Sequence, residues 1–348
     1  MDESFWKDKK VLITGHTGFK GTWLSIWLQK MGARVIGYSL KSYPNDMFFN
    51  VTNLSPKIID VRGDVTDLEN LKKTFDVLNP DIVFHLAAQP LVRKSFDQPI
   101  DTLKTNILGT ANILDCIKNT ESVKVGIIIT SDKCYKNVEQ IYGYKENDSV
   151  GGYDPYSCSK GCAELIVDSY RNSFFKKQNK FVATVRAGNV IGGGDWSEDR
   201  LIPDCIKSLK RGEAIKIRNP DHTRPWQHVL DPLAGYITLA EKMFKEEKYD
   251  EAWNFGPNIQ SIKPVREVVC KMTKQWGNGE WIDCSNPDEK HEATLLSLDI
   301  SKAYFILNWK PKWGIDEAIR YTVDWYKKAE SENVYSLCTN QIDEYNLL

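Results

Sequence analysis

The chain has 348 residues, enough for one large α/β core or for two unequal lobes that share an interface. Its 46 lysines and arginines nearly balance 47 acidic residues, so no global field favours nucleic acid or an anionic membrane as a partner. The 8 cysteines include no CxxC pair, which argues against a zinc cluster or a disulfide framework, and no metal site is expected. With no basic leader and no apolar run of about 18 residues, the sequence favours a cytoplasmic protein without a membrane span.

The first elements are predicted to be a strand, a glycine-rich turn, a helix and a second strand. Residues 10–14 (Lys-Val-Leu-Ile-Thr) are typical of a short, fully buried strand. A helix with a broad apolar face should follow from about Gly18 and end at Gly32, and residues 33–38 should form the second strand.

Further strands are expected along the chain at residues 57–61, 82–86, 125–129 and 181–186. Helical patterns separate most of them, and this alternation indicates an α/β fold with a doubly wound (Rossmann) parallel sheet. We expect a Rossmann domain over residues 1–188, then a smaller mixed α/β substrate lobe over 189–330, interleaved with the end of the sheet. The polar residues 331–348 should be a loosely attached C-terminal tail.

The spacing of Gly15, Gly18 and Gly21, between a buried strand and a helix, is the first feature that indicates chemistry. Such glycines let the backbone approach a pyrophosphate at the helix N-terminus, although glycines in this pattern can also serve a tight turn alone. The small residues after the fourth strand would let a dinucleotide lie across the sheet edge. Asp64 could accept a hydrogen bond from an adenine amine.

One part of a typical NAD site is missing from the second strand. This strand ends in Tyr38-Ser39-Leu40-Lys41, without the acid that usually holds the adenosine 2′-hydroxyl of NAD. We predict NAD rather than NADP, and Lys41 is the residue that favours the alternative.

A candidate catalytic set follows the fifth strand. Ser131 lies where a polar side chain at the sheet edge would meet a ligand, and Asp154-Pro155 should start a helix that carries Tyr156 and Lys160. Four residues apart, these two share a helix face, so the ammonium can lie near the phenol and favour its anion. Either residue alone would be an ordinary surface side chain. Their order after the nucleotide loop favours a nicotinamide enzyme that acts on a hydroxyl group.

These motifs, in this order, resemble the extended short-chain dehydrogenase/reductases that modify nucleotide sugars, and among them the 4,6-dehydratases. The resemblance covers about residues 5–325, and its specific parts are Ser-Asp-Lys-Cys-Tyr at 131–135 and Arg-Pro-Trp-Gln-His-Val at 224–229. It rests on residues 15–24, 88–93, 130–135, 151–157, 186–196, 224–230 and 291–293. It implies NAD as cofactor and CDP-glucose or a similar nucleotide hexose as substrate.

The resemblance also implies a reaction. Tyr156 would remove the proton from the sugar 4-hydroxyl while Ser131 holds that oxygen, and the resulting ketone acidifies C5, so that water is lost across C5 and C6. Asp132 would protonate the leaving 6-hydroxyl, with its pKa raised by burial. Where related dTDP-glucose enzymes have Thr-Asp-Glu, this chain has Ser131-Asp132-Lys133. Lys133 is then either a neutral base at C5 or a cation that stabilises the enolate.

The resemblance places further residues at the cofactor and the substrate. The expected cofactor-binding residues are Gly15, Thr17, Gly18, Phe19, Gly21, Asp64, Val65, Leu86, Ala87, Ala88, Asn106, Tyr156 and Lys160. The expected substrate-binding residues are Gln89, Arg93, Asn189, Arg218, Arg224 and His291. Guanidinium groups match phosphate oxygens, although Arg218 could be plain surface charge and His291 a packing residue.

Two helices with apolar residues at helical spacing, within 103–117 and 163–170, bear on assembly. One face of each must cover the sheet, and the resemblance implies that the other faces pair in a homodimer or a dimer of dimers.

The resemblance also suggests a role in making 6-deoxy sugars for surface polysaccharide such as O-antigen. Two alternatives remain, a nucleotide-sugar 4-epimerase and a nonenzymatic NAD-binding regulator.

Overall fold

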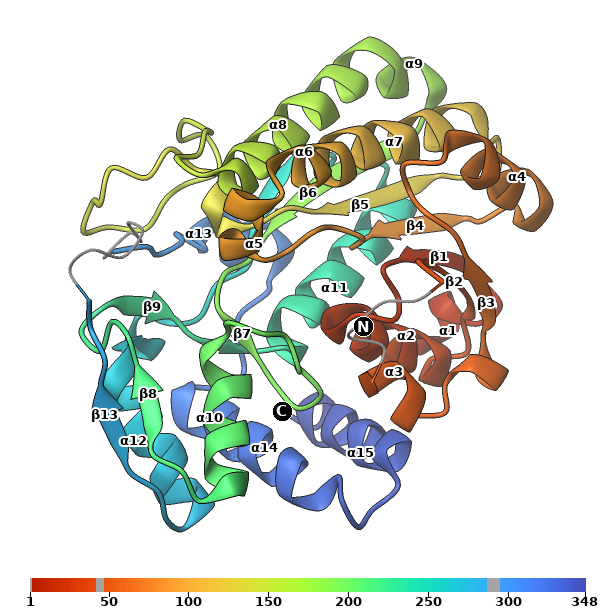
Figure 1. Ribbon diagram of the computed structural model, residues 1–348. Helices are drawn as coiled ribbons and strands as arrows, with labels where there is room; N and C mark the ends of the chain where they lie inside the picture. Colours follow the sequence, from red (N-terminus) through yellow and green to blue (C-terminus); the bar gives the residue numbers. More distant parts are fainter. Residues whose placement is uncertain (1, 42–46, 287–294) are drawn as a thin grey trace.

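The computed structural model describes residues 2–41, 47–286 and 295–348. Its centre is a seven-stranded, wholly parallel sheet with the order β11-β6-β5-β4-β1-β2-β3 (Figure 1). The strands are β1 (Lys10–Thr14), β2 (Arg34–Ser39), β3 (Ile59–Arg62), β4 (Ile82–His85), β5 (Val125–Ile129), β6 (Phe181–Arg186) and β11 (Ala252–Asn254). Apart from β11, this is the 3-2-1-4-5-6 order of a doubly wound nucleotide-binding sheet. The expected fold class is confirmed.

The inner strands of the sheet are apolar along most of their length because both faces of the sheet are covered, whereas the edge strand β3 (Ile-Asp-Val-Arg) is only partly buried. In β1, Val11 and Ile13 contribute to one hydrophobic core and Leu12 to the other. Such strands read as continuous apolar runs, which is why the sequence locates six of them to within about two residues. The sequence analysis missed β11, whose three residues Ala-Trp-Asn form no such run.

Helices cover the two faces of the sheet in separate groups (Figure 1). One face carries α4 (Leu68–Leu78), α7 (Gly109–Asn119) and α8 (Pro155–Tyr170), and the other carries α2 (Phe19–Lys30) and α11 (Leu230–Glu246). The chain reaches α7 through α5 (Val92–Asp97), α6 (Pro99–Leu103) and the π-helical turn η2 (Lys104–Leu108). It leaves α8 through the π-helical turn η4 (Arg171–Phe175) and α9 (Lys176–Gln178).

The chain after β6 contributes three pairs of short strands and several helices. The pairs are β7 (Val190–Ile191) with β10 (Gln227–His228), β9 (Thr223–Pro225) with β12 (Ile262–Pro264), and β8 (Ile215–Ile217) with β13 (Trp281–Asp283). The helices are α10 (Leu201–Arg211), α12 (Val265–Trp276), α13 (Ser301–Leu307), α14 (Ile315–Lys328) and α15 (Val334–Asn346). The remaining elements are α1 (Glu3–Trp6), α3 (Met47–Val51), η1 (Ser55–Lys57), η3 (Asp132–Cys134) and η5 (Ile259–Ser261). Of the helices within the described ranges, none has the length and apolar character needed to cross a bilayer.

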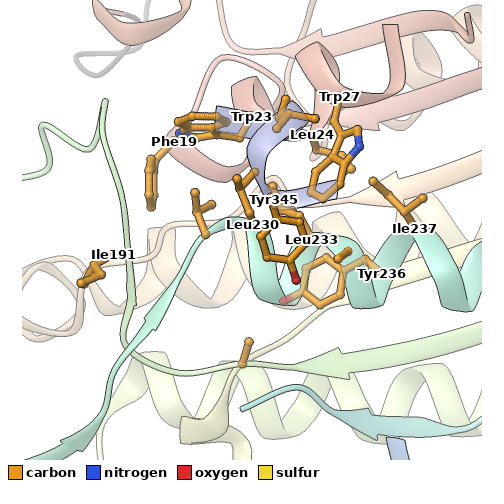
Figure 2. Close-up of a cluster of buried hydrophobic side chains, with 14 of the residues drawn as sticks. Phe19, Trp23, Leu24, Trp27, Ile191, Leu230, Leu233, Tyr236, Ile237 and Tyr345 are labelled. Carbon is orange, nitrogen blue, oxygen red and sulfur yellow. The ribbon is translucent and has the colours of Figure 1, made fainter. Parts of the chain in front are cut away.

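The larger core is built around α2, which is apolar on nearly every side. Its Trp23 and Trp27 face Leu230 and Leu233 of α11, and Tyr345 of α15 lies beside them (Figure 2). The rings of Trp27 and Tyr345 meet edge to face with centroids 5.7 Å apart. The nucleotide loop that precedes α2 is therefore attached to a rigid element.

The expectation of a loosely attached C-terminal tail is wrong. Residues 334–346 form α15, in which Leu337, Ile342 and Tyr345 are buried. The Tyr345 hydroxyl donates a 2.8 Å hydrogen bond to the buried Asp231 carboxylate. The apolar residues recur at helical spacing among polar ones, so overall polarity concealed a docked helix.

Candidate active site

A cavity of about 970 Å³ lies at the carboxyl edge of the parallel strands. One wall is formed by the nucleotide loop, by the ends of β2 to β5 and by the start of α8; the other comes from the chain after β6, within residues 187–226. Open α/β sheets bind their ligands at this edge, where the strand order reverses between β1 and β4. We therefore compared the expected site residues with the lining of this cavity.

Two of the three loop glycines are required for steric reasons, and the third leaves open space. Gly15 has φ +72°, and a Cβ there would lie 2.8 Å from the Ala87 nitrogen. A Cβ on Gly21 would lie 2.1 Å from the Gly15 oxygen, so only glycine lets α2 start this close to β1. At Gly18 a Cβ would meet only the Gly15 oxygen at 3.4 Å, and the first turn of α2 has no side-chain cap. The loop thus leaves helix N–H groups facing the cavity, as a pyrophosphate requires.

Most of the expected cofactor-binding residues line this cavity. They are Gly15, Thr17, Gly18, Phe19, Gly21, Asp64, Val65, Leu86, Ala87, Ala88, Tyr156 and Lys160. Thr17 and Ser39 hydroxyls lie 2.9 Å apart at the end of β2, where an acid would usually stand. The nucleotide loop, the ends of the strands and the small residues Ala87 and Ala88 line the same cavity. The site therefore fits a dinucleotide.

Asn106 and Gln89 were expected at the cofactor and the substrate, but neither lines the cavity. The buried Asn106 amide accepts from the Gln89 backbone N–H at 2.8 Å and donates to the Ser159 hydroxyl at 2.8 Å. The Gln89 side chain in turn bonds to the Leu91 backbone and to Thr102. Both side chains hydrogen-bond to the backbone of the loop after β4 without lining the cavity. Asn106 also connects that loop to α8 through Ser159.

The catalytic candidates come together as predicted around the start of α8. Asp154 caps this helix by accepting from the Ser157 N–H, and Pro155 occupies its first turn. Tyr156 and Lys160 are both buried and line the cavity with Ser131 and Asp132. The four side chains could therefore contact a single bound substrate.

Burial is the largest influence on the pKa of Tyr156, and the effect expected of Lys160 on its anion stays a prediction. Burial raises the pKa of Tyr156 to about 12, although the neighbouring Ser131 side chain acts in the opposite direction. The Lys160 ammonium instead donates to the Ile129 carbonyl at 3.1 Å, and burial lowers the pKa of Lys160 to about 8. Sequence spacing put the two groups on one helix face but could not give their degree of burial.

One carboxyl oxygen of Asp132 is hydrogen-bonded, and the other has no hydrogen-bond partner among the described residues. Its Oδ1 accepts from the Ser131 hydroxyl at 2.9 Å, whereas Oδ2 is buried without a hydrogen-bond partner among the described residues. This oxygen lies against Gly188, where a Cβ would come within 1.8 Å of it. Gln227 fixes the Gly188 carbonyl with a 3.1 Å hydrogen bond. Gly188 thus makes room for the Asp132 carboxyl beside the cavity.

Lys133 lines the cavity as a half-buried residue, and its backbone N–H donates to the Ser131 hydroxyl at 3.2 Å. Of the expected substrate residues, Arg93, Asn189, Arg218 and Arg224 also line the cavity. Arg218 pairs with Asp199 at 3.2 Å, so part of its charge is already engaged. His291 lies outside the described residues.

Sequence reasoning missed several charged residues in the cavity, among them Lys20, Asp195 and Arg200. Asp195 and Arg200 form an ion pair at 3.0 Å in the segment after the triple glycine at 192–194. Lys20 lies within the glycine motif itself, so its position was visible although its role was not. Within the described ranges, no group of His, Cys, Asp or Glu side chains is arranged to hold a metal ion.

A buried ion pair behind the site was also missed. Glu164, one turn after Lys160, accepts from Arg186 at both oxygens, at 2.9 and 2.8 Å. It also accepts from the hydroxyls of Thr130 and Thr184, and Arg186 donates to the Tyr135 hydroxyl at 2.7 Å. One carboxylate therefore joins α8, the end of β5 and β6.

The fold and the site together define a protein of the short-chain dehydrogenase/reductase class. The chain belongs to the nucleotide-sugar 4,6-dehydratase family, whose model, described as GDP-mannose 4,6 dehydratase, matches residues 12–322. A CDP-glucose 4,6-dehydratase from Salmonella typhimurium is 46% identical, over 99% of this chain and 98% of that relative.

Solved structures share the fold over most of the chain. An epimerase from Methanothermobacter thermautotrophicus has a TM-score of 0.82 and 26% identity, covering 98% of this chain and 97% of that one. A dTDP-glucose 4,6-dehydratase from Bacillus anthracis, solved with NAD, has a TM-score of 0.77 and 21% identity, covering 92% and 97%.

The buried Glu164 carboxylate should make the unfolding free energy depend on pH. Burial opposes the charged form of Glu164, but the Arg186 charge and three side-chain hydrogen bonds outweigh it and hold the pKa of Glu164 below its ordinary value. A lowered folded-state pKa contributes stability that is present above the unfolded pKa of about 4.3 and is lost as pH falls through the folded value. Glu164→Gln should lower the unfolding free energy by about 3 kcal/mol at pH 7, because it leaves Arg186 buried without a counter-charge.

Urea unfolding at several pH values measures this difference. The difference should shrink as pH falls below the unfolded pKa of about 4.3, and it should disappear at pH values below the lowered folded pKa, where the wild-type carboxylate is protonated as well. The control is Asp168→Asn, exposed on the same helix, which should cost less than about 1 kcal/mol. A Glu164→Gln protein as stable as wild type at pH 7 would contradict this account of the pair.

Proposed function

We propose that this protein is a CDP-glucose 4,6-dehydratase, which uses NAD to convert CDP-glucose into CDP-4-keto-6-deoxyglucose. The observation that carries the proposal is the buried, half-unpartnered Asp132 carboxyl beside Ser131, in one cavity with Tyr156 and Lys160. A 4,6-dehydratase needs such an acid next to its oxidation centre. Identity of 46% to the Salmonella typhimurium CDP-glucose enzyme supports the nucleotide and the sugar.

NAD would lie along the nucleotide loop and the strand ends. The uncapped first turn of α2 and the open side of Gly18 would hold its pyrophosphate, and Asp64, which lines the same cavity, would accept a hydrogen bond from the adenine amine. When bound, NAD accepts a hydride from C4 and returns it to C6, and the positive charge of its oxidised ring favours ionisation of a nearby phenol. The division of the chain near residue 188 into a cofactor domain and a substrate lobe is part of this proposal.

Tyr156 and Ser131 perform the oxidation half of the reaction. Ser131 would donate to the sugar O4 and hold it against Tyr156, whose phenolate form would take up the O4 proton as C4 loses its hydride. The pKa of about 12 for the buried phenol means that the neutral form prevails in the protein by itself. Proton uptake therefore depends on cationic groups that come close to Tyr156 in the complex.

Asp132 and Lys133 serve the elimination. The C4 ketone acidifies C5, Lys133 removes the C5 proton or stabilises the enolate as a cation, and Asp132 protonates the departing 6-hydroxyl, which leaves as water. Protonation of C5 from an exchangeable group accompanies hydride return to C6. No second substrate is needed, because the cofactor is regenerated.

The second wall of the cavity should bind the nucleotide and its diphosphate. Arg93, Arg218 and Arg224 line it, and guanidinium forks match phosphate oxygens. Asn189, which follows Gly188 and has φ +42°, also lines the cavity and would lie near the diphosphate. The product would feed deoxysugar synthesis for surface polysaccharide.

A nucleotide-sugar 4-epimerase is the second candidate, since an epimerase shares the fold with a TM-score of 0.82. An epimerase uses Tyr and Lys but needs no acid beside Ser131. The nonenzymatic regulator is less well supported, because the complete catalytic set lines the cavity.

Substitution of Asp132 separates the dehydratase from the epimerase. In the wild type, CDP-glucose should give a 4-keto-6-deoxy product faster than dTDP-, GDP- or UDP-hexoses, as read by NMR. Asp132→Asn should still reduce NAD on mixing with substrate, because C4 oxidation does not use the acid. It should lose about 100-fold or more in dehydration.

The control for this substitution is Asp148→Asn, a partly exposed residue outside the cavity, which should keep wild-type rates. A C4 epimer formed equally fast by the wild type and Asp132→Asn would support the epimerase. Failure of the wild type to turn over any sugar nucleotide would revive the regulator.

We also propose that the protein forms a homodimer through the outer faces of the helices near α7 and α8. Four large apolar side chains are exposed there, at Ile100, Leu108, Leu165 and Phe174. The inner residues of the same helices, such as Leu114 and Val167, are buried against the sheet. Such exposed apolar faces are typical of a protein interface. Dimers of dimers would require a second surface.

Leu165→Glu should convert the dimer into a monomer, because it places a charge in the apolar centre of the proposed interface. Light scattering after gel filtration measures the mass, for which one chain is 39.9 kDa. Val77→Glu, an exposed change on α4, is the control and should leave the dimer intact. A wild type that runs as a monomer would overturn this part of the proposal.

A further inference from the structure

Two free thiols lie together on the outer face of α8, the helix that carries Tyr156 and Lys160. Cys158 and Cys162 are four residues apart, and their side chains are hydrogen-bonded to each other. Cys158 is exposed and Cys162 is half-buried. Neither thiol lines the cavity, so the reaction proposed above does not use them.

Most of the other cysteines are unsuited to reaction with a dissolved compound. Four of them are buried, and burial raises the pKa of each thiol; they are Cys116, Cys134, Cys205 and Cys338. Cys270 and Cys284 are exposed, on α12 and directly after β13. The pair on α8 therefore offers two thiols that one reagent can reach in succession.

The thiol pair is on the same helical turn as the catalytic lysine. Cys158 and Cys162 flank Lys160 in the sequence, and Tyr156 lies two residues before Cys158. The buried Lys160 ammonium donates to the Ile129 carbonyl at 3.1 Å on the inner side of α8. The backbone that joins the two thiols is thus the backbone that positions Lys160 in the cavity.

A disulfide between the two sulfurs would require this turn to move. Side chains four residues apart on a helix have Cβ atoms about 5–6 Å apart. A disulfide holds its two Cβ atoms about 3.5–4.5 Å apart. Closing that gap distorts the turn between Cys158 and Cys162, and a misplacement of about 1 Å can cost an enzyme about 100-fold in rate.

We propose that Cys158 and Cys162 form a thiol–disulfide switch on the outer face of α8, which a small-molecule disulfide closes. The Cys158 thiolate attacks the small disulfide, forms a mixed disulfide and releases one thiolate. The Cys162 thiolate then attacks the Cys158 sulfur and releases the second. The pair loses two electrons, the small disulfide gains them, and the two cysteine protons pass to the released thiolates. A dithiol reductant reverses both steps.

The two cysteines have different parts in this switch. The exposed Cys158 is the sulfur that a dissolved disulfide meets first. Burial, with the neighbouring Cys158, raises the pKa of Cys162, so its attack is the slower step. The loss of turnover on closure rests on the proposed function, whereas formation of the disulfide does not.

Oxidised glutathione is the probe that tests the switch on the native protein, in its own oligomeric state. The parent protein for these experiments carries Cys284→Ser, because that exposed thiol lines the cavity and could block it by itself. Mass spectrometry should then show a disulfide between Cys158 and Cys162. Turnover of CDP-glucose should fall about 100-fold, and dithiothreitol should restore it.

Amide hydrogen exchange gives a readout that needs no turnover. It should become faster across residues 156–162 when the disulfide forms, because the helical hydrogen bonds of this turn are disturbed. The rest of the sheet and its helices should keep the exchange rates of the reduced protein. Circular dichroism verifies that the oxidised protein remains folded.

Two substitutions in the parent protein serve as controls. Cys162→Ser separates the disulfide from simple modification of Cys158: it should stop at the mixed disulfide, with one glutathione attached, and keep most of its turnover. Cys270→Ser removes an exposed thiol on α12 and should respond to oxidised glutathione like the parent.

Several results would overturn the inference. One is a native protein that keeps both thiols free, and another is a disulfide that joins two chains instead. Full turnover with the Cys158–Cys162 disulfide in place, or an equal loss of turnover in Cys162→Ser, would also overturn it. If the reduced parent turns over no sugar nucleotide, the proposed function fails, and unchanged hydrogen exchange over residues 156–162 on oxidation would then overturn the switch separately.

Discussion

The buried ion pair between Glu164 and Arg186 is the constraint on which the site depends. Both oxygens of one carboxylate are held by one guanidinium, and two threonine hydroxyls complete its shell. The carboxylate belongs to the helix that carries Lys160, and Thr130 directly precedes Ser131. The two halves of the catalytic set, one from a strand end and one from a helix, are thus positioned by the same buried charge. Such a pair is costly to break, and it gives the helix one defined position on the sheet.

Close approach is the second requirement of the site. Gly15 and Gly21 let the nucleotide loop, β4 and α2 meet without side chains between them, and Gly188 lets Asp132 keep one oxygen unpartnered beside the cavity. Rigid surroundings hold these contacts, because α2 is packed between the sheet, α11 and α15 (Figure 2). The order is the same throughout: the core fixes the elements, and the elements bring polar groups together at the edge of the sheet.

Local patterns predicted most of the fold and the centre of the site. The apolar strands, the Asp154-Pro155 helix start, the loop glycines and Tyr156 with Lys160 all depend on neighbouring residues, so the sequence was sufficient for them. What was missed depends on tertiary contacts. Asn106 and Gln89 are polar residues whose hydrogen bonds join separate segments, from Gln89 to Thr102 and from Asn106 to Gln89 and to Ser159. The pKa of Tyr156 rises through burial that spacing does not reveal, and α15 docks on a surface made by other elements.

The central claim is that this cavity removes water from a nucleotide hexose by way of a C4 ketone. The most direct measurement is incubation of the purified protein with NAD and CDP-glucose in deuterated water, with the product read by NMR. We predict a 4-keto-6-deoxy product with deuterium at C5, because the C5 proton is exchanged during elimination. A product without deuterium at C5, or a C4 epimer, would contradict the account.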